Sequence, residues 1–382
     1  MENTQKAAVR KLKLVQRGKM DITFFTLVIV ILTIGLVMLF SASSYSAYAY
    51  KNNSYFFITK QAGFAVFGVV AMYIISRIDY HILRRFAIAL YVISVGLLVT
   101  VLVLPPMYEG YQFKRWITEP INFQPSEIAK FAVILLFAHF ISLNYKKMEK
   151  FTYGILFFGG LLIVVCGLVV VEPHLSATIL IFCIGITLMV VGGIKMRWVA
   201  GGVIGGTALA AMVILTGIVN YGGDRIKYWM HPELDPRGDG FQVLQSLYAI
   251  ASGGFMGRGI GNSRQKYLWL PEPQNDFIFS IVCEELGLIG ALVIVTLFAL
   301  LVWRGFVIAM RAPDKFGSLL AIGLTFQVGL QTALNILVVT NAIPNTGISL
   351  PFFSYGGTSL MMLLAQMGVI MSISRSSTVE KT

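Results

Sequence analysis

Residues 22–43 read ITFFTLVIVILTIGLVMLFSAS and contain no charged side chain. A helix needs about 20 consecutive, mostly apolar residues to cross a bilayer, so this stretch predicts a membrane span. Residues 1–20 before it are basic and polar, and the apolar run is longer than that of a cleavable signal peptide. The stretch is therefore predicted to remain as the first transmembrane helix.

Similar runs follow along the chain and predict an all-α polytopic membrane protein of about ten transmembrane helices. Composition agrees, because 57% of the 382 residues are hydrophobic and only 13% are charged. Soluble domains are about a quarter charged, so lipid must surround most of this chain. The runs lie at 22–43, 55–76, 86–104, 124–143, 152–171, 176–193, 199–219, 277–303, 317–340 and 355–374.

Lys and Arg residues gather in alternate connecting segments, and this bias sets the orientation of the helices. Both termini are predicted to be cytoplasmic, because every short cytoplasmic loop is then basic. The tails are residues 1–20 and 376–382, around a single transmembrane domain at 21–375. A long extracytoplasmic loop then covers 220–275, between the seventh and eighth helices. Loops of this length are usually functional, and its residues 240–251 are expected to form an amphipathic stretch.

Several function classes are excluded. The net charge of +12 does not indicate nucleic-acid binding, because the basic residues are dispersed over short loops. Cys166, Cys183 and Cys283 lie in apolar runs without the spacing of a disulfide framework or a zinc site. The glycines of Gly257-Arg-Gly-Ile-Gly261 do not follow a strand, as a nucleotide-binding motif would require. No dedicated metal or nucleotide site is therefore predicted.

Three outward-facing segments hold polar residues that apolar packing does not explain. In the first, Glu127 and Lys130 are three residues apart and share a helix face where that helix enters the membrane. Ionisable groups at this depth are costly and indicate function, although a purely structural ion pair explains the same spacing. Arg115 and Trp116, just upstream, either line the same cavity or anchor the chain at the interface.

The second segment, Leu270-Pro-Glu-Pro-Gln-Asn-Asp276, ends where the long loop returns into an apolar helix. The helix dipole favours a carboxylate at this position, so Asp276 is a helix cap on the simplest interpretation. In a partly dry cavity the same carboxylate can act as a general base. Glu284 and Glu285 lie further along the helix and are expected to be structural, with one of them meeting a cation.

The third segment, residues 341–359, is free of charged side chains and re-enters the membrane. Non-helical backbone at that depth is tolerated only where protein buries it or where it lines a wet cavity. Ser354 and Tyr355 therefore either bind sugar hydroxyls or phosphate, or form a tight turn between two helices.

Together these motifs resemble the SEDS family (shape, elongation, division and sporulation). Each motif is weak alone, but their combination in this order is specific. The stretch 240–250 is more similar to the FtsW/SpoVE branch than to the RodA branch. The motifs are Arg115-Trp116, Phe123-Gln-Pro-Ser-Glu127-Ile-Ala-Lys130, Leu270-Pro-Glu-Pro-Gln-Asn-Asp276-Phe-Ile-Phe279, Glu284-Glu285-Leu-Gly287 and Leu350-Pro-Phe-Phe-Ser-Tyr-Gly-Gly357.

The chain departs from the family pattern at two places. Asn275 stands where the family more often has threonine, directly before the aspartate. His174 stands where many members have aspartate. Because the second change removes a carboxylate, no catalytic role is assigned to that loop.

The resemblance implies a peptidoglycan glycosyltransferase in the bacterial cytoplasmic membrane, serving division or sporulation. Its substrate would be lipid II, a disaccharide pentapeptide on undecaprenyl pyrophosphate, polymerised at the outer face. The family's catalytic aspartate maps onto Asp276, and its cavity is lined by Glu127 and Lys130. A class B penicillin-binding protein is implied as the transpeptidase partner.

On this hypothesis Asp276 takes the proton of the acceptor hydroxyl, which attacks the anomeric carbon of the donor with inversion. The departing pyrophosphate needs positive charge. The candidates are Arg115, Arg225, Arg258, Lys266 and a divalent cation such as Mg²⁺, for which the sequence shows no dedicated cage. Two rival functions are a lipid II flippase, which would carry its charges near the bilayer midplane, and a non-catalytic scaffold for the transpeptidase.

Overall fold

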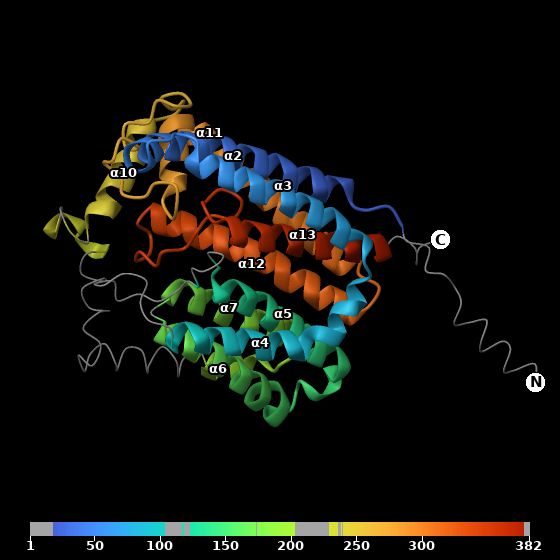
Figure 1. The fold of residues 1–382 in the computed structure, drawn as a ribbon. Coiled ribbons are helices and arrows are strands. Elements are labelled where there is room, and N and C mark those ends of the chain that lie inside the picture. Colours follow the sequence, from blue (N-terminus) through green and yellow to red (C-terminus); the bar gives the residue numbers. More distant parts are fainter. Residues whose placement is uncertain are drawn as a thin grey trace, which may run out of the picture.

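Residues 18–103, 117, 123–172, 174–202, 229–235, 238 and 240–377 are described by the structure, which is a computed structural model. Their regular structure is helical apart from one isolated bridge between Ile117 and Phe123. The helices run side by side, with the start of α2 (Ile22–Lys51) and the end of α13 (Gly357–Ser377) at one end of the bundle and α10 (Phe241–Gly253) at the other (Figure 1). We call these the terminal end and the loop end. The expectation of an all-α membrane protein is confirmed.

Eight described helices are long and apolar enough to cross a membrane. A π-helical turn, η4 (Thr152–Phe157), leads into the fifth of these spans, and η2 (Tyr80–Ile82) leads into the third. The eight helices are α2 (Ile22–Lys51), α3 (Phe56–Arg77), α4 (Leu83–Val103), α5 (Pro125–Leu143), α6 (Phe158–Val171), α11 (Ile278–Met310), α12 (Lys315–Val339) and α13 (Gly357–Ser377). Three shorter helices are α7 (Leu175–Val191), η3 (Tyr145–Lys147) and η5 (Pro232–Leu234).

Every expected run except 199–219 coincides with a described helix, and most of that run lies outside the described residues. The tails before residue 18 and after residue 377 also lie outside them. Within the long loop, α10 (Phe241–Gly253) confirms the expected amphipathic stretch. Some helices are longer than the apolar runs that predicted them. Helix α2 continues to Lys51 and α11 to Met310, so both extend beyond the thickness of the hydrocarbon core.

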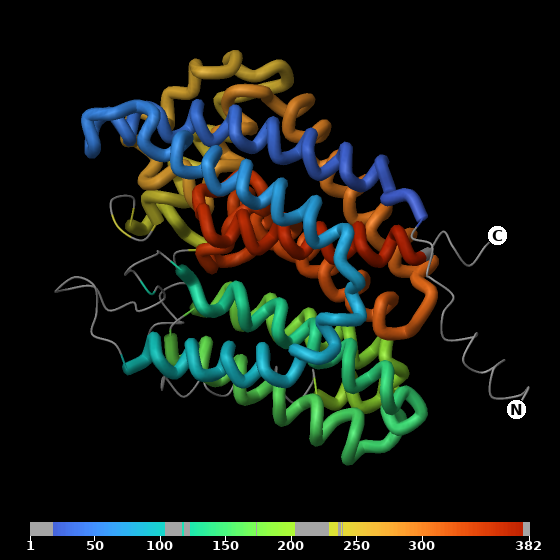
Figure 2. Tube along the Cα trace, turned by 45° about the vertical axis from the view of Figure 1, so that its right-hand side comes forward, coloured from blue at the N-terminus to red at the C-terminus, as the bar shows by residue number. Residues whose placement is uncertain are grey.

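Two groups of helices make up the bundle. One group contains α2, α3, α11 and α13, and the other contains α4, α5, α6 and α7, as Figure 1 and Figure 2 both show. Helix α12 joins them, because it packs against α11 and α13 on one side and against α5 and α7 on the other. A residue on α12 can therefore contact both groups at once.

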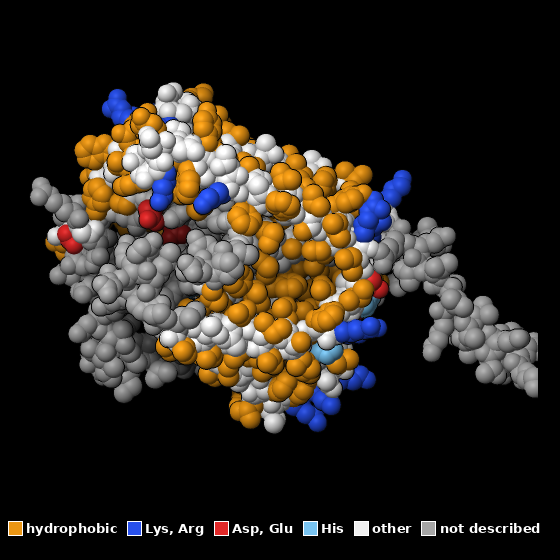
Figure 3. All heavy atoms as spheres, viewed as in Figure 1, with side chains coloured by type: hydrophobic (Ala, Val, Ile, Leu, Met, Phe, Trp, Pro, Cys, Tyr) orange, Lys and Arg blue, Asp and Glu red, His pale blue; other side chains and the backbone are white. Residues whose placement is uncertain are grey.

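On the face that Figure 3 shows, the described surface between the two ends is hydrophobic, and charged side chains gather toward the ends. On α11, for example, Leu288, Leu292 and Trp303 are 48%, 55% and 62% exposed. Exposing apolar surface to water costs about 25 cal/mol per Å², so a belt of this kind is stable only in contact with lipid. The chain is a multi-pass membrane protein.

Helix α11 is interrupted at Gly287, where φ is 66° and ψ is −169°. The interruption leaves backbone groups without partners in the helix, and the loop after α10 supplies replacements. Arg258 N donates to Glu284 O at 3.0 Å, and Leu288 N donates to Gly254 O at 2.9 Å. The loop that leads to Asp276 is thus bonded to the backbone of a membrane helix on both sides of the break.

We expect Gly287→Ala to lower the free energy of unfolding by at least about 2 kcal/mol, because this backbone region is almost restricted to glycine. A Cβ atom there would also lie 2.3 Å from Gly257 N. Thermal unfolding in detergent measures the loss. The matched control is Gly167→Ala on α6, where no atom lies within 4 Å of the new Cβ. Equal stability of the two variants would contradict the interpretation.

Candidate active site

Asp276 lies in the turn that precedes α11, at the loop end of the bundle. The N-cap of α11 is Phe277, one residue later, so the helix-cap interpretation of Asp276 does not describe the helix start. Asn335 Nδ2, on α12, donates to the backbone carbonyl of Asp276 at 2.7 Å and to Ile348 O at 2.7 Å. Because Asn335 is completely buried, its amide fixes the turn that carries Asp276 against the loop that follows α12.

That loop reaches the Asp276 carboxylate at Gly347. Gly347 has φ +69°, and a Cβ atom on it would lie 3.3 Å from Asp276 Oδ2. The Gly347 carbonyl accepts a hydrogen bond from Ser176 Oγ, near the start of α7, at 3.2 Å. Segments from both helix groups therefore meet around Asp276.

We expect Gly347→Ala to reduce the activity of this site by up to about tenfold and to lower stability by about 1–2 kcal/mol, the cost of a left-handed backbone at alanine. The new Cβ would displace the Asp276 carboxylate by a few tenths of an ångström, and misplacing a catalytic group lowers the rate. The control is Gly356→Ala in the same loop, where the new Cβ makes an ordinary contact of 3.6 Å with Ser359. Turnover and thermal midpoint are measured on both variants. Full activity in Gly347→Ala would show that Asp276 tolerates the shift.

Glu127 and Lys130 form the ion pair that their spacing predicts. Lys130 Nζ lies 2.8 Å from Glu127 Oε1, and the lysine is only 2% exposed. Lys130 Nζ also lies 3.5 Å from Gln331 Oε1 on α12. Gln331 Nε2 in turn donates to Ser349 O at 3.0 Å. The pair is therefore linked through α12 to the loop that contacts Asp276.

Ser354 and Tyr355 occupy a turn that is held by internal hydrogen bonds. Ser354 Oγ donates to Asn275 O at 2.7 Å and accepts from Leu350 N at 2.8 Å. Tyr355 N donates to Gln274 O at 2.8 Å. These hydrogen bonds account for the turn without a ligand, and they fix the residues directly before Asp276. A role of Ser354 or Tyr355 in binding substrate stays a prediction.

Glu284 and Glu285 are both buried, and each meets its own cation. Lys266 Nζ lies 3.1 Å from Glu285 Oε1, and Arg258 Nε lies 3.8 Å from Glu284 Oε1. Ser41 Oγ, from α2, donates to Glu285 at 2.7 Å. These contacts confirm that the two glutamates have partners inside the protein. They also show that Lys266 and Arg258 are bound to internal carboxylates, so their role at a departing pyrophosphate stays a prediction.

Three other predicted residues, Arg115, Trp116 and Arg225, lie outside the described residues. His174, at the family departure, is buried and contacts Gln124 Nε2 at 3.4 Å and Ser126 Oγ at 3.5 Å. It thus lies beside the start of α5, next to the Glu127–Lys130 pair.

Sequence reasoning missed Gln331 and Asn335. They are four residues apart on one face of the apolar helix α12 and link the ion pair with the Asp276 turn. Two buried amides at this spacing in a membrane span are a detectable signal, because buried polar groups there require partners.

The arrangement described above can be compared with known proteins. The family model described as "Cell cycle protein", for FtsW, RodA and SpoVE, matches residues 21–379. The chain belongs to this family. The resemblance stated from the motifs is thereby confirmed.

Relatives of this family protein cover nearly the whole chain. "Stage V sporulation protein E" of Bacillus subtilis is 40% identical over an alignment of 369 positions that covers 94% of this chain and 97% of that protein. A protein of Trichlorobacter lovleyi named "Probable peptidoglycan glycosyltransferase FtsW" is 36% identical, with 93% of each chain covered.

Solved structures agree with this fold. A chain from a peptidoglycan synthase complex, described as coordinating polymerization and crosslinking, superposes with a TM-score of 0.78 at 27% identity and covers 94% of this chain and 98% of its own. The rod shape determining protein RodA of Thermus thermophilus superposes with a TM-score of 0.67 at 25% identity, covering 93% and 97%.

Proposed function

We propose that this protein is a peptidoglycan glycosyltransferase that polymerises lipid II at the outer face of the cytoplasmic membrane, with Asp276 as general base. Family membership and the names of the relatives support the reaction. The observation that carries the site is the meeting of both helix groups around the Asp276 carboxylate, through Asn335 and Gly347. The distribution of Lys and Arg over the connecting segments supports an orientation with this loop end outside the cell.

Two lipid-borne substrates meet at this site. The 4-hydroxyl of the acceptor GlcNAc loses its proton to the Asp276 carboxylate, and its oxygen bonds to the anomeric carbon of the donor MurNAc. The bond from that carbon to the pyrophosphate oxygen breaks, and the pyrophosphate leaves with the electron pair. Attack from the opposite face inverts an α link to a β link. Pyrophosphate is already a good leaving group, so the general acid used by glycosidases is not needed.

The Glu127–Lys130 pair positions the site rather than reacting in it. It reaches the Asp276 region through Gln331, Ser349 and the loop they hold. Lys130 is thus a positioning residue.

A divalent cation such as Mg²⁺ can add positive charge at the departing pyrophosphate. Among the described residues there is no group of three His, Cys, Asp or Glu side chains that could hold a metal. We expect EDTA to leave the thermal midpoint of the purified protein unchanged. A drop reversed by Mg²⁺ would instead indicate a metal site built into the fold.

The position of the charges favours catalysis over lipid transport. Lys130 is the sixth residue of α5, which places its Cα about 8 Å from the start of a 19-residue helix at 1.5 Å per residue. Transporters of lipid-sized or ionic substrates place their key groups near the bilayer midplane. A lipid II flippase is therefore the second candidate. A scaffold for a class B penicillin-binding protein is the third.

The deciding experiment is polymerisation of purified lipid II, with and without that transpeptidase partner, alongside a lipid II flipping assay in liposomes. Glycan strands made by the wild-type protein, with no flipping, are the expected result. Flipping without polymer would identify a transporter. If the partner alone makes as much polymer as the two proteins together, this protein is a scaffold.

A further inference from the structure

The turn after α10 carries two apolar side chains that protrude from the protein. Phe255 and Met256 are 74% and 78% exposed, and both belong to the long loop that the sequence places outside the membrane. Large apolar side chains that stand together on a surface mark a site of contact with another apolar phase or partner. We call residues 254–257 the tip.

Helix α11 shows how deep the tip lies. The ion pair between Arg304 Nη2 and Asp21 Oδ2, at 2.8 Å, joins α11 to the start of α2 and marks one edge of the apolar belt. Ile289 N, on α11, donates to Phe255 O at 3.2 Å. At 1.5 Å per residue, Ile289 lies about 22 Å along the helix from Arg304. The hydrocarbon core of a bilayer is about 30 Å thick, so the tip lies at the depth of the acyl chains.

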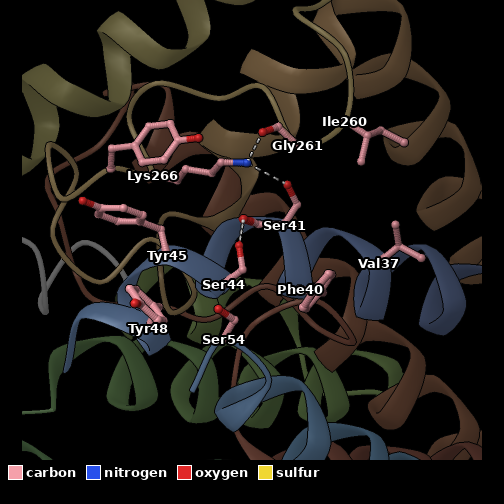
Figure 4. Close-up of a pocket in the computed structure, with 11 residues that line it drawn as sticks. Val37, Phe40, Ser41, Ser44, Tyr45, Tyr48, Ser54, Ile260, Gly261 and Lys266 are labelled. Atoms are coloured by element: carbon pink, nitrogen blue, oxygen red, sulfur yellow. Dashed lines mark hydrogen bonds between the residues drawn. The ribbon is translucent and has the colours of Figure 1, made fainter. Parts of the chain in front are cut away.

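Helix α2 leads to the same depth. Ser41 lies about 30 Å along α2 from the same ion pair, so it marks the opposite edge of the core. Figure 4 shows Ser41 beside Lys266 and Gly261, which belong to the segment that follows the tip. Ser41 Oγ also donates to Glu285 at 2.7 Å. The tip bonds to α11 beyond Glu285 in the direction of the ion pair, so it lies inside this edge.

The backbone of the tip suits this environment. Non-helical backbone at membrane depth needs partners for its polar groups, because hydrocarbon supplies none. Leu288 N donates to Gly254 O at 2.9 Å. Gly257 N donates to Gly253 O at 2.9 Å, and the carbonyl of Phe255 is bonded to α11 as described above. The polar groups of the tip are thus bonded to protein while its two large side chains point away from it.

The tip continues a surface that already contacts lipid. Leu288, Ile289 and Leu292 on α11 are 48%, 49% and 55% exposed. The stretch 286–303 to which they belong contains no charged residue. Because the tip bonds directly to Leu288 and Ile289, its side chains extend the lipid-facing belt of α11 sideways.

We propose that the tip is a re-entrant membrane contact, in which Phe255 and Met256 insert among the acyl chains of the leaflet at the loop end. The contact ties the loop that leads to Asp276 to the bilayer as well as to α11. The inference does not rest on the proposed reaction, since it uses only the depth, the exposure and the backbone bonds of the tip.

The test measures how fast a charged, membrane-impermeant maleimide labels variants with one added cysteine. The full chain is held in lipid nanodiscs at one copy per disc, so that both membrane faces are accessible and a second copy cannot cover the tip. The variants are Met256→Cys in the tip, Leu292→Cys in the lipid belt and Glu233→Cys at a side chain that is 64% exposed in the long loop. Wild type gives the background from the three native cysteines.

We expect Met256→Cys to react at about the rate of Leu292→Cys and about tenfold or more slowly than Glu233→Cys, because the reacting thiolate does not form in hydrocarbon. Rates are divided by those of the denatured chains, which removes differences between the cysteines themselves. Labelling of Met256→Cys at the rate of Glu233→Cys would place the tip in water, open to a protein partner, and would overturn the inference. If Met256→Cys does not fold, Phe255→Cys gives the same comparison.

Discussion

Replacement of Asp276 by asparagine is expected to reduce lipid II polymerisation by about 10²–10⁴-fold, the usual contribution of a general base. Asparagine has the same shape as aspartate but cannot take up the acceptor's proton at neutral pH. The fold should survive, because asparagine has the size of aspartate and Asn335 still binds the backbone carbonyl of residue 276. Polymer yield from purified lipid II and the thermal midpoint are measured together.

The matched control for this prediction is Glu233→Gln, which removes an exposed carboxylate from the same long loop. It should polymerise at the wild-type rate. If Asp276→Asn protein is folded and also polymerises near the wild-type rate, the base lies elsewhere. If both variants lose activity, the net charge of the loop is what matters, and the assignment of Asp276 is equally wrong.

The Glu127–Lys130 pair should show a large effect on stability. Removing one partner of a buried ion pair leaves the other charge uncompensated and costs about 3–5 kcal/mol. We therefore expect Lys130→Met to lower the thermal midpoint sharply, since Lys130 is almost completely buried and Glu127 is its ionised partner at 2.8 Å. Polymerisation should be lost in the same variant.

The double variant Glu127→Gln with Lys130→Met separates structure from function. Both charges are then gone, so most of the stability should return. If the pair positions the loop that contacts Asp276, activity stays low in the restored protein. Recovery of both stability and activity would show that the ion pair only fixes helix packing, which the spacing alone also allowed.

Much of the fold could be predicted because membrane helices are determined locally. Runs such as 22–43 satisfy their own backbone hydrogen bonds and expose apolar side chains to lipid, so the sequence alone specifies them. The same holds for the i, i+3 pair of Glu127 and Lys130, whose contact needs only one helix. The amphipathic stretch found as α10 follows the same rule.

The interruption of α11 could not be predicted in this way. Glycines are common inside transmembrane helices, so the sequence around Gly287 does not indicate that the helix is interrupted there. Its left-handed conformation exists because the 254–259 segment, far from it along the chain, supplies the missing backbone bonds. The partners of Glu284 and Glu285 could not be predicted either, because they depend on where the loop after α10 lies.

The sequence by itself determined nearly all of the segments that enter the membrane and where an unexplained carboxylate stands, and it predicts how the helices are oriented. It left Asp276 open as a helix cap or a base. Only the tertiary structure decided that Phe277 caps α11, that Asn335 and Gly347 hold the Asp276 turn, and that Lys266 is paired with Glu285. The reason is physical. A helix forms from neighbours a few residues apart, whereas the contacts of Asn335, Gly347 and Lys266 join residues about 20 to 70 positions apart along the chain, which only packing brings together.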